Sequence, residues 1–207
     1  QTLQGRLGED RILPNIFGVD EATLFSQVRA VQIVACGTSY YSGLVARYWI
    51  EEIAGIPCQV EIASEIRYRK VALMDNTLFV SLSQSGETAD TLAALRQAND
   101  LNYLASLCIC NVPNSSIVRE SDLTLMTKAG TEIGVASTKA FTTQLVDLLM
   151  LAITLAKNQP AGLANEGQLV RHLHSLPATV EKVLTVEPVL KKLAEFFVDK
   201  DHALFLG

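Results

Sequence analysis

The stretch TLFVSLSQSGETADTLAALRQA, residues 77–98, decides the fold, because it leads from an apolar segment through a hydroxyl-rich turn into a helical segment. Residues 77–82 are mostly apolar and predict a buried strand, and residues 89–98 predict a helix. The turn, residues 83–88, therefore lies between the carboxyl end of a strand and the amino end of a helix. The rest of the chain contains further units of this kind.

The turn has the groups that bind an anion. The first N–H groups of a helix lack partners and its dipole is positive there, which favours a negative ligand. Gly86 would allow the backbone to approach a ligand closely. Ser83, Ser85 and Thr88 add hydroxyl groups, and Gln84 adds an amide. Because the turn has no lysine, it is not a nucleotide-binding P-loop. We predict a pocket for one phosphate group, and the alternative is a helix cap with spare serines.

A second unit of the same type lies upstream. Residues 31–36 predict a strand that leads directly into Thr38 and Ser39, and a helix follows from about Tyr40 to Ala54. In parallel sheets, ligands bind beyond the carboxyl ends of the strands, near the point where the strand order reverses. Two hydroxyl-rich turns at such ends can form one site, which favours the phosphate pocket over the helix cap.

Alternating strands and helices predict the fold class. They indicate an α/β fold: a three-layer α/β/α sandwich with a mainly parallel five-stranded sheet, flavodoxin-like or Rossmann-like, with right-handed crossovers. Asp20 is expected to cap a short helix, and Ser64 another. The remaining strands are predicted at residues 58–63, 103–110 and 123–127, and the remaining helices at 21–28, 65–71, 115–120 and 139–157.

The flanks predict a piece of a larger protein. Residues 1–19 are expected to be an irregular leader from an interdomain linker, and residues 20–160 form the domain. Residues 161–200 predict a helical linker, with helices at 165–186 and 188–198 and an interruption near Pro177. Residues 201–207 form an apolar strand followed by glycine, like residues 31–37, and predict the start of a second, truncated copy of the domain.

Composition excludes several classes of function. The net charge is −5 and no basic run occurs, so we expect no nucleic-acid partner. The longest apolar stretch, residues 145–156, contains Asp147 and is too short to span a membrane. No secretory signal is present, and the cysteines lack zinc-ligand spacing, which predicts reduced thiols in a cytoplasmic protein without a metal. These cysteines are Cys36, Cys58, Cys108 and Cys110, and His172, His174 and His202 are expected at the surface.

Three motifs resemble one family. They are residues 36–39 (CGTS), 83–91 (SQSGETADT) and 130–142 (GTEIGVASTKAFT). Together they are similar to the first sugar isomerase (SIS) domain of the glucosamine-6-phosphate synthases, also called glutamine–fructose-6-phosphate aminotransferases (isomerizing). The serine turn marks the wider SIS superfamily, and residues 132–141 are more discriminating. Ile66 departs mildly, since the family more often has an aromatic residue there.

The resemblance implies a reaction and a set of binding residues. Such enzymes release ammonia from glutamine and use it to convert fructose 6-phosphate to glucosamine 6-phosphate in amino sugar biosynthesis, without a metal or other cofactor. They act as dimers or larger assemblies. By this resemblance, the phosphate-binding positions are Ser39, Ser83, Gln84, Ser85 and Thr88, and the sugar-contacting positions are Thr38, Val135 and Ser137.

The resemblance also implies what these residues do not do. The family keeps its isomerase glutamate, ring-opening histidine and essential lysines in a second SIS domain, and its glutaminase in an N-terminal domain. Residues 1–207 match neither, so no catalytic residue is expected here and the piece alone should be inactive. Glu87 and Glu132 are expected to have structural roles, in capping or in loop hydrogen bonds.

Two alternatives share the serine turn. One is a sugar-phosphate-sensing SIS module of a regulator, and the other is a different SIS isomerase or a deglycase. The absence of a basic DNA-binding segment and the motif at residues 135–141 favour the synthase.

Overall fold

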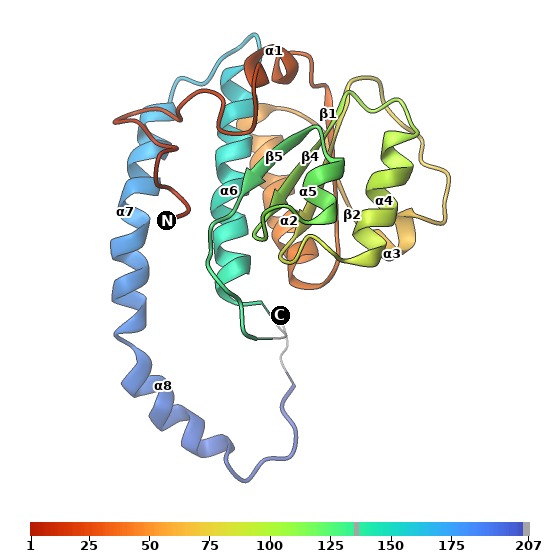
Figure 1. The fold of residues 1–207 in the computed structure, drawn as a ribbon. Helices are drawn as coiled ribbons and strands as arrows, with labels where there is room; N and C mark the ends of the chain where they lie inside the picture. The colour runs from red at the N-terminus through yellow and green to blue at the C-terminus, as the bar shows by residue number, and fades with distance from the viewer. Residues whose placement is uncertain (135–136, 205–207) are drawn as a thin grey trace.

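The computed structural model describes residues 1–134 and 137–204, and its centre is a five-stranded sheet in the order β2-β1-β3-β4-β5 (Figure 1). Each neighbouring pair of strands is parallel, which confirms the predicted fold class. Each predicted strand within residues 30–127 is present and shifted by at most two residues at either end. The strands are β1 (Ala30–Ala35), β2 (Cys58–Ile62), β3 (Thr77–Ser83), β4 (Ala105–Cys110) and β5 (Leu123–Met126).

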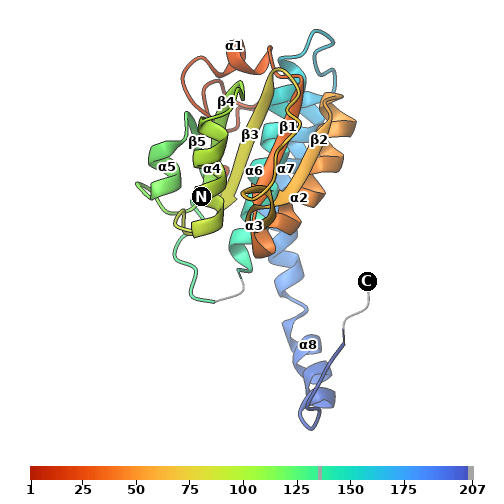
Figure 2. The same cartoon turned by 90° about the vertical axis from the view of Figure 1, so that its right-hand side faces the viewer.

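Helices cover both faces of the sheet (Figure 2). Side chains alternate between the faces along each strand, so Ile33 packs in one apolar cluster and Val34 in the other. The first face carries α2 (Gly37–Trp49), α6 (Lys139–Lys157) and the start of α7 (Glu166–Leu184), and the second carries α3 (Ala63–Ile66), α4 (Ala89–Asn99) and α5 (Ser116–Glu120).

The strand order reverses between β1 and β3. The chain passes from β1 through α2 to β2 on one side, and from β3 through α4 to β4 on the other. The helices α2 and α4 cover opposite faces of the sheet. Their first turns therefore begin at the ends of the neighbouring strands β1 and β3 and lead in opposite directions. This is the topological switch point at which α/β sheets bind ligands.

The α6 helix is a core helix. Among the described residues it alone has the length and composition of a membrane-spanning helix, with a mean hydropathy of 1.4. However, 67% of its most apolar 18-residue stretch is buried in the domain. Apolar residues all round a helix suit burial between a sheet and other helices. Its bounds agree with the prediction from sequence.

The N-terminal segment packs against this core. It is irregular, as predicted, but Ile12 and Phe17 are fully buried. Arg6 is also buried, and its Nη1 donates a hydrogen bond of 2.9 Å to Asp147 Oδ1 in α6. Burial raises the pKa of the Asp147 carboxyl to about 7, although the Arg6 guanidinium opposes the shift.

Two predicted helix caps are wrong. The α1 helix (Glu21–Phe25) is shorter than predicted, and Asp20 has left-handed backbone angles with no capping bond. The carboxylate of Glu21 instead accepts N–H bonds from Asn15 and Phe17, at 2.7 and 2.8 Å. Ser64 lies inside α3 and does not cap it.

Helix boundaries on the first face also differ from the prediction. The helix predicted from Tyr40 to Ala54 begins three residues earlier, where the chain turns directly out of β1, and its last five residues form a π-helix, η1 (Ile50–Ala54). The α7 helix runs through Pro177 without interruption. A proline removes one backbone hydrogen bond, which the rest of a long helix can tolerate.

An exposed arm follows α7. It contains α8 (Glu187–Ala194) and the 3₁₀ turn η2 (Glu195–Phe197), and it extends beyond the domain (Figure 1). No residue of α8 is buried. The predicted strand at 201–206 is absent from residues 201–204, and residues 205–207 lie outside the described residues.

Candidate functional site

A cavity of about 420 Å³ lies at the switch point, between the first turns of α2 and α4. Its walls come from the carboxyl ends of β1 and β3 and from the loop before α6. Every predicted site residue that the structure describes lines it, and Val135 lies outside the described residues. These lining residues are Thr38, Ser39, Ser83, Gln84, Ser85, Thr88 and Ser137.

The first wall is the start of α2. Gly37 has a φ of 59°, a left-handed conformation that glycine adopts without strain and that turns the chain directly from β1 into the helix. The first bond of this helix joins the Tyr40 N–H to the Cys36 carbonyl at 3.4 Å. The N–H groups of residues 37–39 therefore have no partner within the helix and are available to an anion.

The second wall is the turn before α4. Ser83 Oγ accepts the Gly86 N–H at 2.9 Å, and Ser85 Oγ accepts the Glu87 N–H at 3.2 Å. A hydroxyl oxygen that accepts a hydrogen bond keeps its own hydrogen to donate. The turn thus orients two hydroxyl donors, and Thr88 Oγ1 lies 3.4 Å from Ser83 Oγ.

Gly86 has a different role from the predicted one. It is buried outside the cavity and has a φ of 69°. A Cβ at this position would lie 1.9 Å from Ser115 Oγ and 2.8 Å from Cys110 Sγ. The glycine therefore allows the turn to pack against α5 and β4, and the expectation that it brings the backbone to a ligand is wrong.

The cavity walls carry no lysine, arginine or carboxylate among the described residues. Glu87 accepts the Ser116 N–H at 2.7 Å, and this bond lowers the pKa of its carboxyl. Glu132 accepts the Ala140 N–H at 3.2 Å, in the first turn of α6. Both glutamates have structural hydrogen bonds, as predicted. An anion would be held by hydroxyl groups, backbone N–H groups and helix dipoles.

The histidines are exposed and three of the four cysteines are buried, as expected, but Cys36 is not buried. All four thiols are free, and burial raises the pKa of Cys58 to about 12 and of Cys108 to about 11, which makes these thiols unreactive. Cys36 is half-buried and lines the cavity, a position that the sequence analysis did not assign. His172 and His174 are exposed. Residues 1–134 and 137–204 contain no cluster of three side chains that could hold a metal ion.

Fold and cavity together define a class: doubly wound α/β domains with a cavity at the switch point, lined by the amino ends of two helices. A family model described as "SIS domain" matches residues 24–154, and the chain belongs to this family.

Several proteins with known names are similar to the whole of this chain. The chain is 62% identical to a glutamine–fructose-6-phosphate aminotransferase (isomerizing) from Pseudomonas syringae pv. tomato and 61% identical to one from Pseudomonas putida. Both matches cover 100% of this chain and 34% of the relative, so the chain spans about a third of their length. A solved structure, the C-terminal domain of glucosamine-fructose-6-phosphate aminotransferase from Francisella tularensis, has a TM-score of 0.94 and 50% identity. That match covers 100% of this chain and 58% of the solved one.

Proposed function

We propose that this chain is the sugar-phosphate-binding part of the isomerase half of a glutamine–fructose-6-phosphate aminotransferase. The observation that carries the proposal is the cavity at the switch point, which hydroxyl groups from two helix starts line. Its volume of about 420 Å³ suits a small phosphorylated sugar. The similarity to named aminotransferases supports fructose 6-phosphate as the ligand.

In this proposal two sets of lining residues hold different parts of the ligand. Ser39, Ser83, Gln84, Ser85 and Thr88 receive the phosphate, whose oxygens accept bonds from hydroxyls and unpartnered N–H groups. Thr38, Val135 and Ser137 contact the sugar. The positive ends of the two helices stabilise the phosphate dianion. The hydrogen-bond donors are already oriented towards the position that the phosphate would occupy, so binding requires only that water leaves them.

Chemistry beyond binding requires other groups. Isomerisation moves a proton between neighbouring carbons, and a general acid or base must reach that proton. No carboxylate, histidine or lysine lines the described walls. We therefore propose that proton transfer and ammonia supply come from other parts of a longer cytoplasmic enzyme, which acts as a homodimer. The 207-residue piece alone should form no glucosamine 6-phosphate from glutamine.

Titration of the chain with fructose 6-phosphate and with fructose tests the proposal. The phosphorylated sugar should bind measurably and fructose should not, because the donors recognise the anion. Ser85→Ala should weaken phosphate binding by about tenfold, the effect of one charge-assisted hydrogen bond. Ser175→Ala, on the exposed face of α7, is the matched control and should bind as the wild type does. Equal binding of fructose and its phosphate would contradict the anion pocket.

A further inference from the structure

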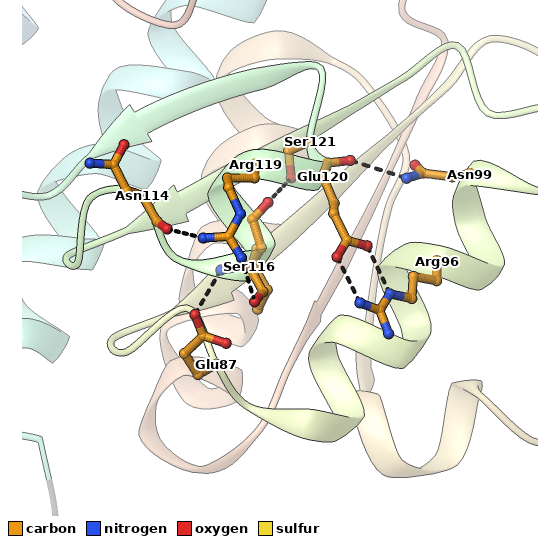
Figure 3. A network of polar contacts seen from close by, with 9 residues as sticks. Glu87, Arg96, Asn99, Asn114, Ser116, Arg119, Glu120 and Ser121 are labelled. Atoms are coloured by element: carbon orange, nitrogen blue, oxygen red, sulfur yellow. Dashed lines mark hydrogen bonds and ion pairs between the residues drawn. The ribbon is translucent and has the colours of Figure 1, made fainter.

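One glutamate of the pocket turn does not line the cavity and instead contacts the start of α5 (Figure 3). Glu87 lies between the pocket residues Ser85 and Thr88, but its exposed side chain is directed at the start of α5. There its Oε1 accepts the Ser116 N–H at 2.7 Å. The mechanism proposed above does not use this carboxylate.

The α4 helix, which directly follows the turn, contacts the C-terminal end of α5. Arg96, on α4, donates to both carboxylate oxygens of Glu120, at 2.8 and 2.7 Å (Figure 3). Asn99 donates to the Glu120 carbonyl at 3.1 Å. The turn and α4 therefore contact both ends of a five-residue helix, and α5 is fixed relative to both.

Contacts next to Glu87 transmit the position of α5 to the pocket. The Ile117 N–H donates to the Gly86 carbonyl at 3.1 Å, and Ser115 Oγ lies where a side chain at position 86 would start. The Gly86 N–H in turn donates to Ser83 Oγ, which lines the cavity. A shift of the turn on α5 would change the direction of the hydroxyls that face the ligand.

Charge gives Glu87 a second effect. A carboxylate that rotated from α5 towards the cavity would repel a phosphate dianion, and two like charges a few ångströms apart repel strongly where water is partly excluded. The bond to Ser116 keeps the carboxylate on the far side of the turn. It also lowers the pKa of Glu87, so the anion that accepts this bond persists below the usual pH of glutamate protonation.

We propose that Glu87 is a positioning residue for the phosphate pocket: its bond to the Ser116 N–H holds the 83–88 turn in the conformation that directs the Ser83 and Ser85 hydroxyls at the ligand. The inference rests on the proposed function, because the affinity that it explains is that for a phosphorylated sugar.

The chain offers a substitution for each partner of this bond. Glu87→Ala removes the acceptor, and Glu87→Gln keeps an oxygen that can accept. Ser116→Pro removes the donor N–H, and it fits because Ser116 is the first residue of α5. It also removes the Ser116 hydroxyl, which accepts a bond from Arg119 Nη2 at 3.1 Å, so its effect is compared with that of Ser116→Ala, which removes the hydroxyl alone. Ser115 before it has φ −67° and ψ 166°, an extended conformation that a following proline permits. Ser116→Ala keeps the N–H and is the matched control.

Fructose 6-phosphate affinity is the first measurement. Glu87→Ala and Ser116→Pro should each weaken binding by about tenfold, and the double variant should be no weaker than either, because both remove the same bond. Glu87→Gln and Ser116→Ala should stay within about threefold of the wild type. Arg96→Ala loosens only the far end of α5 and leaves the Glu87–Ser116 bond in place, so it should weaken binding less than Glu87→Ala does. Melting temperatures are measured in parallel, and binding is compared well below the lowest of them.

Amide hydrogen exchange and the Glu87 titration, both followed by NMR in the ligand-free chain, are the second measurement. Glu87→Ala and Ser116→Pro should speed exchange at Gly86 and Ile117, and Ser116→Pro should raise the pKa of Glu87. Wild-type affinity in Glu87→Ala, or unchanged exchange at both amides, overturns the proposal. If the wild type itself binds no sugar phosphate, the proposed function fails. Faster exchange in the variants would then still support the role of Glu87 in holding the turn.

Discussion

At the scale of single residues, the pocket depends on a close contact outside it. Gly86 combines a positive φ with a site that a Cβ cannot enter, because Ser115 Oγ would lie 1.9 Å from it. Hydroxyl residues around it contact the cavity and can be changed one at a time without this overlap. The position that tolerates substitution least is therefore one that no ligand is expected to touch.

Gly86→Ala should lower the free energy of unfolding by about 3 kcal/mol, through backbone strain and overlap with Ser115. Urea unfolding measures the loss. Ser115→Gly in the same chain removes the nearest atoms and should restore part of the loss. Ser115 makes no side-chain capping bond, and the bond that this change removes, from Ser115 Oγ to the Val112 carbonyl at 3.0 Å, contributes about 1 kcal/mol. A Gly86→Ala chain as stable as the wild type would show that the turn can move away from α5.

The predicted binding residues that the structure describes all line the cavity, whereas Gly86 does not line it, for a physical reason. Hydroxyl residues between a strand and a helix predict an anion site from local sequence alone, because the backbone geometry of such a junction is regular. The role of Gly86 depends on Ser115, which is distant in sequence and comes close only when β3 and β4 pair. Cys36 was missed as a lining residue because burial in a strand explained it equally well.

At the scale of elements, the core helix α6 contains a buried acidic residue, Asp147. The Asp147 carboxylate is fully buried, and its guanidinium partner comes from the N-terminal segment. Arg6 also donates to the Met126 carbonyl at the end of β5. This one side chain therefore joins the N-terminal segment to α6 and to the strand that precedes the pocket loop.

Arg6→Met should destabilise the chain more at pH 8.5 than at pH 5.5. The folded pKa of Asp147, about 7, lies above its ordinary value of 3.8, so the folded state binds the extra proton and this group's contribution to stability falls as pH rises between those values. Without Arg6 the folded pKa rises further, and the fall extends to higher pH. At pH 8.5 the loss should reach about 3 kcal/mol, the effect of leaving a buried charge unpaired.

Urea unfolding at the two pH values checks this expectation. The double variant Arg6→Met with Asp147→Leu removes both charges and should recover most of the stability at pH 8.5. A loss in Arg6→Met that is equal at both pH values would mean that Asp147 does not titrate between them, and would contradict the expectation.

Elements were predictable where one local signal dominated. The α6 bounds follow from apolar spacing, and the buried strands follow from their apolar runs. Helix ends were less predictable, because they depend on distant partners. Glu21 bonds to the loop at Asn15 and Phe17, so α1 starts without a cap from Asp20. Pro177 suggested a break, but one missing bond does not end a helix of 19 residues.

At the scale of the whole molecule, the domain and the arm differ in burial. The sheet and its helices enclose two apolar clusters, one on each face. The arm places large apolar side chains in solvent, with Val189 at 68% and Phe196 at 76% exposure. The domain therefore contains almost all of the packing that resists unfolding.

Removal of residues 186–207 should leave the melting temperature within about 2 °C of the full chain, because α8 buries none of its residues. Calorimetry on both chains makes the comparison. The shortened chain should also associate less at high concentration, since it exposes less apolar surface. A fall of 10 °C or more would show that the arm packs on the domain in solution.

The neutral walls of the pocket also affect how a ligand arrives. Helix dipoles and hydroxyl groups act over only a few ångströms, so they hold an anion but attract none from a distance. The chain as a whole carries a net charge of −5, and its field opposes an approaching dianion. If the cavity binds a phosphorylated sugar as proposed, its capture is expected not to be electrostatically steered. Dissolved salt would screen the repulsion during diffusion and leave the short bonds of the bound state largely unaffected.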